Sequence, residues 1–320
     1  MFGYMFPRTQ GKFGRFKKVE TMCREMCKFM KRNSGKFLAG VLIALSLMVC
    51  GAGALAEPIT VMSYNIRMDT AADGINAWPY RKDAVAEMIG PKYEGDIIGL
   101  QEVLKRQLDD IQDRLPAYAW VGVGRDDGRD RGEFSPIFYR TDRFRLLATN
   151  TYWLSETPEL PGSRSWDAAI TRVVTWARFE DLSTGRQLTF FNTHFDHLGE
   201  QARVESSQLL LDRLVGIAGD TPFILTGDLN VQESEQAYKV LAHGNNLLGD
   251  ARYVSETAHQ GPTASFNDWE SLRPPESRID YIFISNGIRT LNHRILDDRY
   301  EGRFPSDHLP VVSELLLIAD

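Results

Sequence analysis

Polar residues that could act on phosphate stand at the ends of apolar runs in this chain, and the clearest pair is Asp228 and Asn230. They follow the run Pro222-Phe223-Ile224-Leu225, which has the length and flanking residues of a buried strand. In an extended segment, side chains two residues apart point the same way. An acid and an amide buried beside a core strand are costly unless they bind something, so the pair could form the floor of a metal-and-water site. Taken alone, Asp228 could equally cap a strand-to-helix turn.

Five further strand ends carry residues of the same kind. Each has an ordinary explanation by itself, such as a turn amide, a solvated charge or a structural histidine. Asp280 is the hardest to explain in that way, because Ile279 and Tyr281-Ile282-Phe283 flank it and a buried carboxylate needs a partner. Six coincidences together favour a shared site. The full set comprises Asn65, Glu102, Asn192 with His194, Asp228 with Asn230, Asp280, and Asp307 with His308.

This set of residue types suits metal-assisted chemistry on a phosphate ester. Carboxylates and amides are the oxygen ligands that Mg²⁺ prefers, with Mn²⁺ a possible substitute, and water and substrate phosphate complete the coordination. A bound cation polarises a phosphoryl group and helps to generate hydroxide. Histidines nearby can contact phosphoryl oxygens or move protons. No Gly-x-Ser-x-Gly motif is present, so we predict hydrolysis by an activated water and no covalent intermediate.

Short strand-like runs alternate with a few helical stretches, and these elements must position the set. Two of the runs, 173–179 and 187–191, predict a hairpin across the turn Asp181–Gly185. Hairpins mixed with helices indicate two packed sheets with helices outside. The expected helices are 81–88, 106–115, 200–217 and 233–241, and the expected strands are 59–64, 97–100, 136–139, 173–179, 187–191, 223–226, 279–284 and 309–316.

The first 56 residues have the pattern of an export signal. Ten Lys and Arg and two Glu precede an apolar stretch from Phe37 to Ala56, which ends in Ala54-Leu55-Ala56. A basic region, an apolar core and a small-x-small exit are typical of a secretory signal peptide. The basic region is long, so we suspect a true start at Met30. We therefore expect a catalytic domain at 57–320 that is exported to the periplasm or beyond.

Two other interpretations of the leader remain. About 20 apolar residues are enough to cross a bilayer as an uncleaved anchor, which would tether the protein to the membrane. A lipoprotein cleavage before Cys50 is disfavoured, because Val49 stands where a small residue is expected.

The part of the chain after the leader is strongly acidic. Removing the leader's ten basic and two acidic residues leaves 27 Lys and Arg against 41 Asp and Glu, a net charge of −14. This balance disfavours non-specific attachment to DNA or to an anionic membrane. All three cysteines, Cys23, Cys27 and Cys50, lie in the leader, which excludes a disulfide, a thiol nucleophile and a cysteine metal site from 57–320.

The ordered series of motifs resembles the endonuclease/exonuclease/phosphatase superfamily, whose fold is deoxyribonuclease I-like, over essentially all of 58–317. The resemblance implies an α/β fold, a four-layer sandwich of two mixed β-sheets flanked by helices. It also implies the following roles: Glu102 binds Mg²⁺, Asn65 and Asp307 shape the metal site, Asp228 orients or deprotonates the water with support from Asn230, and His194 and the Asp280-paired His308 contact the phosphate. The number of metals and the identity of the general base stay open.

Substrate contacts are implied less firmly. Glu133 resembles the acid that orients the first histidine, here His194, and Arg172 resembles a phosphate-contacting arginine; Asn192 is assigned to substrate binding with them. The segment after His194, together with Tyr152–Pro158 and Trp166-Asp167, is similar to an exported bacterial branch whose substrates are poorly defined. Within it, Asp196, His197 and Trp166 are candidates to line the substrate pocket. For Asp196 and His197, capping of the helix that begins near Gly199 is slightly favoured.

Two rival functions fit parts of the sequence. A metallo-β-lactamase-like hydrolase would use Asn192-x-His194-x-Asp196-His197, but its first histidine is replaced by Asn192 and further ligands lack a supporting context. A catalytically silent binding module on the same fold usually shows a broken residue set, whereas every expected polar position is filled here. The substrate could be a nucleic acid, a phospholipid head group, or a sugar or inositol phosphate, as a diester or a monoester. No obligatory protein partner is evident, and membrane contact is expected only if the leader is kept.

Overall fold

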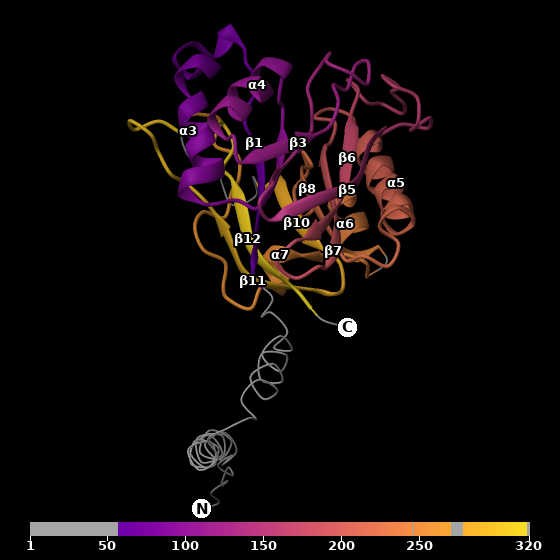
Figure 1. Cartoon of the computed structure of the whole chain (residues 1–320). Helices are drawn as coiled ribbons and strands as arrows, with labels where there is room; N and C mark the ends of the chain where they lie inside the picture. Colours follow the sequence, from indigo (N-terminus) through magenta and orange to yellow (C-terminus); the bar gives the residue numbers. More distant parts are fainter. Residues whose placement is uncertain (1–56, 245, 270–277, 319–320) are drawn as a thin grey trace, which may run out of the picture. The chain divides into compact units, whose positions relative to one another are not determined.

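Two six-stranded β-sheets packed face to face form the centre of the fold (Figure 1). The computed structural model describes residues 57–244, 246–269 and 278–318, so the predicted signal peptide lies outside the described part. Within that part, no helix is both long and apolar enough to cross a membrane.

The first sheet has the strand order β11-β12-β1-β2-β4-β3. Strands β1 and β2 pair in parallel, and their neighbours pair antiparallel, so the sheet is mixed. The strands are β1 (Ile59–Asn65), β2 (Ile97–Gln101), β3 (Tyr118–Val121), β4 (Ile137–Arg140), β11 (Ile288–Ile295) and β12 (Val311–Leu317).

The second sheet has the order β5-β6-β7-β8-β10-β9 and is also mixed, because β7 and β8 are parallel. Strands β6 and β7 form the predicted hairpin. The strands are β5 (Phe144–Trp153), β6 (Val173–Asp181), β7 (Gln187–His194), β8 (Phe223–Asp228), β9 (Gly249–Asp250) and β10 (Asp280–Ile284).

Alternating side chains along the strands build the layers. In β1, Val61 packs between the sheets and Met62 packs on the outer face of the first sheet. In β8, Ile224 packs between the sheets and Leu225 packs on the outer face of the second sheet. Helices α3 (Lys82–Glu87) and α4 (Lys105–Arg114) cover the first sheet, and α5 (Glu200–Ala218) and α6 (Gln236–His243) cover the second (Figure 1). The predicted four-layer sandwich is therefore confirmed.

The same alternation places the site residues. His194 and Asp228 end the parallel strands β7 and β8 in register, and Asp280 begins the antiparallel strand β10 opposite Asp228. Asp228 is four residues beyond Ile224, so it continues the face that packs between the sheets. His194, Asp228 and Asp280, called the polar row below, therefore lie at the edge of the hydrophobic core between the two sheets.

The two sheets approach each other closely at Gly99 of β2. A Cβ atom at this position would lie 2.1 Å from Oγ1 of Thr226 and 2.5 Å from Oδ1 of Asn192, both on the other sheet. Only glycine fits such a contact, and this close approach brings the ends of β1 and β2 next to those of β7 and β8.

Several elements differ from the sequence prediction. Helix α3 ends at Glu87 and continues as a π-helix, Met88–Lys92, which contains Pro91. Strands β3, β5, β9 and β11 were not predicted. The remaining helical segments are the 3₁₀ turns Ala71–Asn76 and Trp78–Tyr80 and the short α7 (Ala251–Val254).

Candidate active site

His308 and Asp280 form a buried hydrogen-bonded pair. Nδ1 of His308 donates to Oδ2 of Asp280 over 2.9 Å, and Nε2 lies 3.7 Å from Oδ2 of Asp228. Burial opposes the charged ring, but the Asp280 and Asp228 carboxylates outweigh it and hold the pKa of His308 well above its usual value. His308 is therefore a cation at neutral pH, with a second N–H available to an anion.

Asp228 lies at the centre of the polar row and is buried. Its Oδ2 accepts a hydrogen bond from Nδ2 of Asn65 (2.9 Å), and its Oδ1 accepts one from the backbone N–H of Asn230 (3.0 Å). Burial, followed by repulsion from Asp280, raises the pKa of Asp228 to about 7. A carboxylate with this pKa can accept and release a proton near neutral pH, as a general base requires.

His194 faces Asp228 from the neighbouring strand. Its Nε2 lies 3.0 Å from Nδ2 of Asn230 and 3.4 Å from Oδ2 of Asp228. Burial, with the positive charge of Arg172 second, lowers the pKa of His194 well below its usual value, so the ring is neutral. Because the amide of Asn230 donates to Nε2, the proton of the neutral ring resides on Nδ1, which is buried without a hydrogen-bond partner.

Glu133 does not hold His194 in the predicted way. Its Oε2 is 4.0 Å from Nδ1 of His194, which is too long for a hydrogen bond. Both carboxylate oxygens instead accept from Arg125 at 2.7 Å. The fork of Arg125 satisfies Glu133 more fully than one imidazole N–H would, so Glu133 acts on His194 at most through its charge.

Arg172 presents unused hydrogen-bond donors within the protein. The residue is only 4% exposed, and its Nε and Nη1 have no hydrogen-bond partner. Nη2 lies 3.3 Å from Nδ1 of His197. Burial, followed by repulsion from Arg125, lowers the pKa of Arg172 to about 10, so it remains charged at neutral pH. A buried charge with free donors is suited to bind an anion such as a phosphoryl group.

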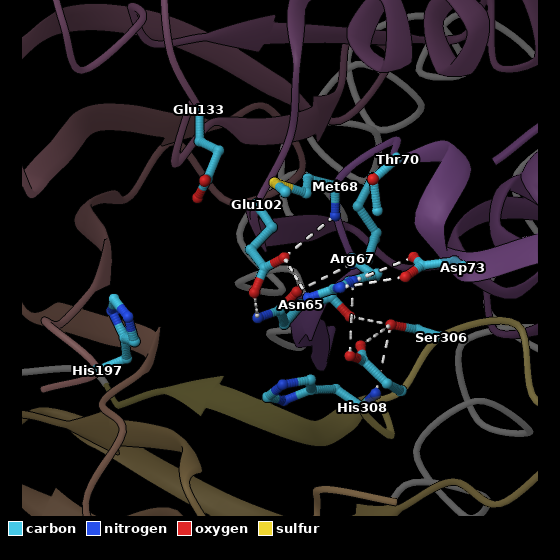
Figure 2. Close-up of polar contacts among 12 residues, drawn as sticks. Asn65, Arg67, Met68, Thr70, Asp73, Glu102, Glu133, His197, Ser306 and His308 are labelled. Carbon is cyan, nitrogen blue, oxygen red and sulfur yellow. Dashed lines mark hydrogen bonds and ion pairs between the residues drawn. The ribbon is translucent and has the colours of Figure 1, made fainter. Parts of the chain in front are cut away.

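Glu102 and Asp307 offer carboxylate oxygens suited to a divalent cation. Oε1 of Glu102 accepts from Nδ2 of Asn65 (3.0 Å) and Oε2 from the N–H of Met68 (3.1 Å), so each oxygen keeps a free lone pair (Figure 2). Oδ1 of Asp307 accepts a long hydrogen bond, of 3.3 Å, from Oγ of Ser306. These hard oxygen ligands fit Mg²⁺ or a similar cation.

Asn65 positions the carboxylates of the site, and its own side-chain oxygen already accepts a hydrogen bond. Its amide N–H₂ bridges Glu102 and Asp228, while its Oδ1 accepts the backbone N–H of Arg67 at 2.9 Å. Asn65 would therefore contribute to the predicted metal site mainly by aligning Glu102.

A second group of possible ligands, Asp228, Asp280 and His308, has ligand atoms within 4.8 Å of one another. Nδ1 of His308 is already bonded to Asp280, but each oxygen of Asp228 accepts one hydrogen bond and keeps a lone pair, as the oxygens of Glu102 do. This group can therefore transfer protons, and its Asp228 carboxylate could also face a cation.

Asn192, assigned to substrate binding from the sequence, is a structural residue between the sheets. It has no exposed surface, and its Nδ2 donates to the carbonyls of Leu100 (2.7 Å) and Pro136 (2.9 Å). Its Oδ1 accepts from Gln101 (2.7 Å) and Thr226 (3.0 Å). All its hydrogen-bonding groups are used, so the substrate-binding assignment does not match its position.

In the segment after His194, one residue is buried and one is exposed. Oδ1 of Asp196 accepts the N–H groups of Leu198 (3.0 Å) and Gly199 (2.7 Å) in the turn before α5, and the residue is 2% exposed. Asp196 therefore holds this turn, whereas the N–H groups in the first turn of α5 donate to Asp167. His197 is exposed, and in Figure 2 it lies with Glu133 on the side of Glu102 away from Asp73. Only His197 of this pair is placed to meet a substrate.

Trp166 is half-buried in the loop between β5 and β6, with a left-handed backbone at φ 57°. The next residue, Asp167, accepts the N–H groups of Gln201 (3.2 Å) and Ala202 (2.6 Å) at the start of α5. The loop that carries Trp166 therefore lies against the start of α5, close in sequence to His197, and the substrate-binding role of Trp166 stays a prediction.

Sequence reasoning missed the charged residues that support the site, above all Arg67, Asp73 and Arg125. Arg67, Glu102 and Asn230 all have left-handed backbones, at φ 57°, 60° and 51°, a strained geometry that often marks functional positions. The buried Arg81 donates to the carbonyls of Ile66, Arg67 and Met68, which holds this strained turn together. The available signal for Arg67 was its place two residues after Asn65.

Comparison with known proteins adds the family. Residues 62–308 match the model of the Endonuclease/Exonuclease/phosphatase family. A family structure from Bacteroides vulgatus is 38% identical and covers 81% of this chain and 99% of its own, with a TM-score of 0.78. The mannosyl-6-phosphatase Bt3783 of Bacteroides thetaiotaomicron is also 38% identical, with the same coverages and a TM-score of 0.76.

Curated relatives are more distant. Nocturnin of Xenopus laevis is 27% identical over 292 residues, covering 79% of this chain and 71% of its own. The Ccr4 exoribonuclease subunit of Mycosarcoma maydis is 24% identical, and the chain spans only 51% of that protein. From the matched residues and the shared fold, the chain belongs to the endonuclease/exonuclease/phosphatase family, whose members are divalent-metal-dependent hydrolases of phosphate esters.

Proposed function

We propose that the protein is a Mg²⁺-dependent phosphomonoesterase that acts on a sugar phosphate. The observation that carries this proposal is the convergence around Oδ2 of Asp228 of a charged histidine at 3.7 Å, a neutral histidine at 3.4 Å and, at 2.9 Å, an amide that aligns Glu102. These groups come from strands of both sheets, and no single structural need explains them.

The chain's own residues divide the work of hydrolysis. Asp228 accepts a proton from the attacking water, because its pKa of about 7 suits that transfer. His308 and Arg172 supply positive charge and N–H groups to the phosphoryl oxygens. His194 and Asn230 complete the polar wall beside Asp228. The ester P–O bond breaks, the water oxygen joins phosphorus, and the alcohol leaves with a proton.

Glu102 and Asp307 would hold the cation, aligned by Asn65. When bound there, Mg²⁺ would polarise the phosphoryl group and favour formation of hydroxide from water. Mn²⁺ is expected to substitute, because it accepts similar oxygen ligands.

A sugar phosphate is favoured over nucleic acid by two observations. The mannosyl-6-phosphatase matches over almost its whole length, whereas the exoribonuclease subunit matches over half. The net charge of −14 over 57–320 also opposes non-specific binding to a polyanion. The exposed His197 and the half-buried Trp166 are the candidates to contact the sugar.

The test is phosphate release by the full chain from mannose 6-phosphate, an inositol phosphate, a phosphorylated lipid head group and a short oligoribonucleotide, with Mg²⁺, Mn²⁺ or EDTA. We expect metal-dependent release from the sugar phosphate, abolished in Asp228→Asn and His308→Ala. Cleavage of the oligoribonucleotide alone would replace the sugar proposal with a nuclease. No turnover of any class would favour the silent binding module.

We also propose that the protein is exported, on the strength of the basic and apolar pattern of residues 1–56. Fractionation of a bacterial host that expresses the full chain, with sequencing of the protein's N-terminus, tests this. A new N-terminus at Glu57 in the periplasm or medium is expected. A full-length protein retained in the cytoplasm would contradict export, and one in the membrane fraction would favour the anchor.

A further inference from the structure

A positively charged side chain, that of Arg67, lies beside both predicted metal ligands without bonding to either. Its Nη1 is 3.8 Å from Oε2 of Glu102, and its Nε is 3.8 Å from Oδ2 of Asp307. We infer that Arg67, tethered by Asp73, is a fixed counter-cation that weakens divalent-metal binding at Glu102 and Asp307. This inference rests on the proposed metal site and concerns how strongly that site holds its ion.

Asp73 keeps the guanidinium in place. Nε and Nη2 of Arg67 donate to the two oxygens of Asp73, each over 3.1 Å, in the bidentate geometry that fixes a guanidinium plane (Figure 2). The main chain of Arg67 is fixed as well, because its N–H donates to Asn65 and its carbonyl accepts from Gln107 at 2.9 Å. The arginine therefore cannot easily swing toward Glu102 or Asp307.

Because Asp73 holds Arg67 in place, the positive charge of Arg67 lies near the metal ligands without a hydrogen bond to their oxygens. At 3.8 Å the guanidinium is beyond hydrogen-bond distance, so it occupies no lone pair of the facing oxygens of Glu102 and Asp307. Oε2 of Glu102 accepts one hydrogen bond, from Met68, and keeps a lone pair for another ligand. Its positive charge nevertheless acts on any cation that those oxygens hold. An arginine bonded directly to the two carboxylates would block the site instead.

The ion pair predicts opposite effects for its two members. Removal of the Arg67 charge also leaves the Asp73 carboxylate unpaired near the ligands, so metal binding should tighten. Removal of the Asp73 charge leaves Arg67 uncompensated and free to pair with Glu102 or Asp307, so metal binding should weaken. For unit charges about 4 Å apart in partly screened surroundings, each change should reach roughly tenfold in Kd.

The experiment is titration of the metal-free full chain with Mn²⁺, with free Mn²⁺ measured by electron paramagnetic resonance. Arg67→Met should lower the Kd about tenfold and Asp73→Asn should raise it about tenfold. The double variant, which removes both charges, should return close to wild type. Arg140→Met and Asp142→Asn are matched controls, since this exposed pair is also bidentate, at 3.0 and 2.6 Å, and should leave the Kd unchanged.

Circular dichroism and thermal melting check that each variant is folded, and the double variant keeps the test decisive if one single variant is unstable. Shifts of the same sign, or no shift, in Arg67→Met and Asp73→Asn would overturn the role of Arg67 while leaving the metal site intact. A wild-type protein that binds no Mn²⁺ would instead overturn the proposed metal site, and the inference with it.

Discussion

His308 and Asp280 join the two sheets through one hydrogen bond of 2.9 Å between Nδ1 and Oδ2. Asp280 is the first residue of β10 in the second sheet, and His308 stands three residues before β12 of the first sheet. The pair therefore depends on correct packing of the sheets against each other. A charged imidazole at this junction exists because two carboxylates outweigh its burial.

Asp280→Asn should lower kcat with little change in KM. The substitution keeps a hydrogen-bond acceptor for His308 but removes the charge that raises its pKa, so less of the ring is protonated at neutral pH. The loss expected for a positioned acid group is about 10²–10⁴-fold. Steady-state phosphate release gives kcat, and an NMR pH titration gives the pKa of His308, which should fall. A normal kcat with a lowered pKa of His308 would show that catalysis does not need the protonated imidazole.

Arg172→Met should raise KM without destabilising the fold. The buried guanidinium carries two N–H groups without partners, which is costly in the free protein and useful only when an anion binds. We expect KM for a phosphate ester to rise by roughly tenfold or more while the melting temperature stays constant or increases. An unchanged KM with a large fall in melting temperature would make Arg172 a structural residue.

Asn192→Ala should reduce stability more than catalysis. The side chain makes four buried hydrogen bonds, three of them to Leu100, Gln101 and Pro136 on the side of the first sheet, and each buried group left unpaired costs about 1–3 kcal/mol. Urea unfolding should show a free energy of unfolding lower by about 3 kcal/mol, with KM nearly unchanged. A rise in KM at full stability would restore the substrate-binding assignment.

Acid should destabilise the protein through His293, which lies away from the site. Its Nδ1 is 2.9 Å from Nδ1 of His259, and burial lowers its pKa from 6.5 to about 3. Below pH 6.5 the imidazole of His293 is protonated in the unfolded state but stays neutral in the folded state. Its contribution to the free energy of unfolding is therefore fully present above pH 6.5 and is lost as the pH falls from 6.5 toward 3. The slope contributed is at most about 1.4 kcal/mol per pH unit.

Urea unfolding at several pH values between 7 and 4.5 measures this slope in wild type and in His293→Asn. The variant should show a shallower fall, since it lacks the titrating ring. Equal slopes in the two proteins would assign the acid sensitivity to other groups.

The sandwich could be predicted because its central strands are continuous apolar runs. In buried strands such as β1, β2 and β8, the change from apolar to polar residues marks the end of the strand in the sequence. Strand β5 was missed because it is an edge strand with mostly exposed side chains, and β11 because polar residues interrupt it around a bulge between Thr290 and Asn292. Edge strands take their form from pairing with a neighbour, which sequence periodicity does not record.

The site residues could be predicted because each lies at or next to one end of a core strand, but their partners could not. Asn192 has the same residue type and position as a ligand, and only the close approach of the sheets at Gly99 shows that it is structural. Likewise, the place of Arg67 beside Glu102 depends on a left-handed turn that no residue pattern announces.

Metal-dependent hydrolysis of a phosphate monoester is the central claim, and the most direct test compares wild type with Asp228→Asn. The measurement is the initial rate of phosphate release from mannose 6-phosphate, with saturating Mg²⁺ and again after EDTA. We predict turnover by wild type only with metal, and a loss of at least about 10²-fold in the variant, which lacks the proton acceptor. Phosphate release that survives EDTA, or an equal rate in Asp228→Asn, would contradict the account.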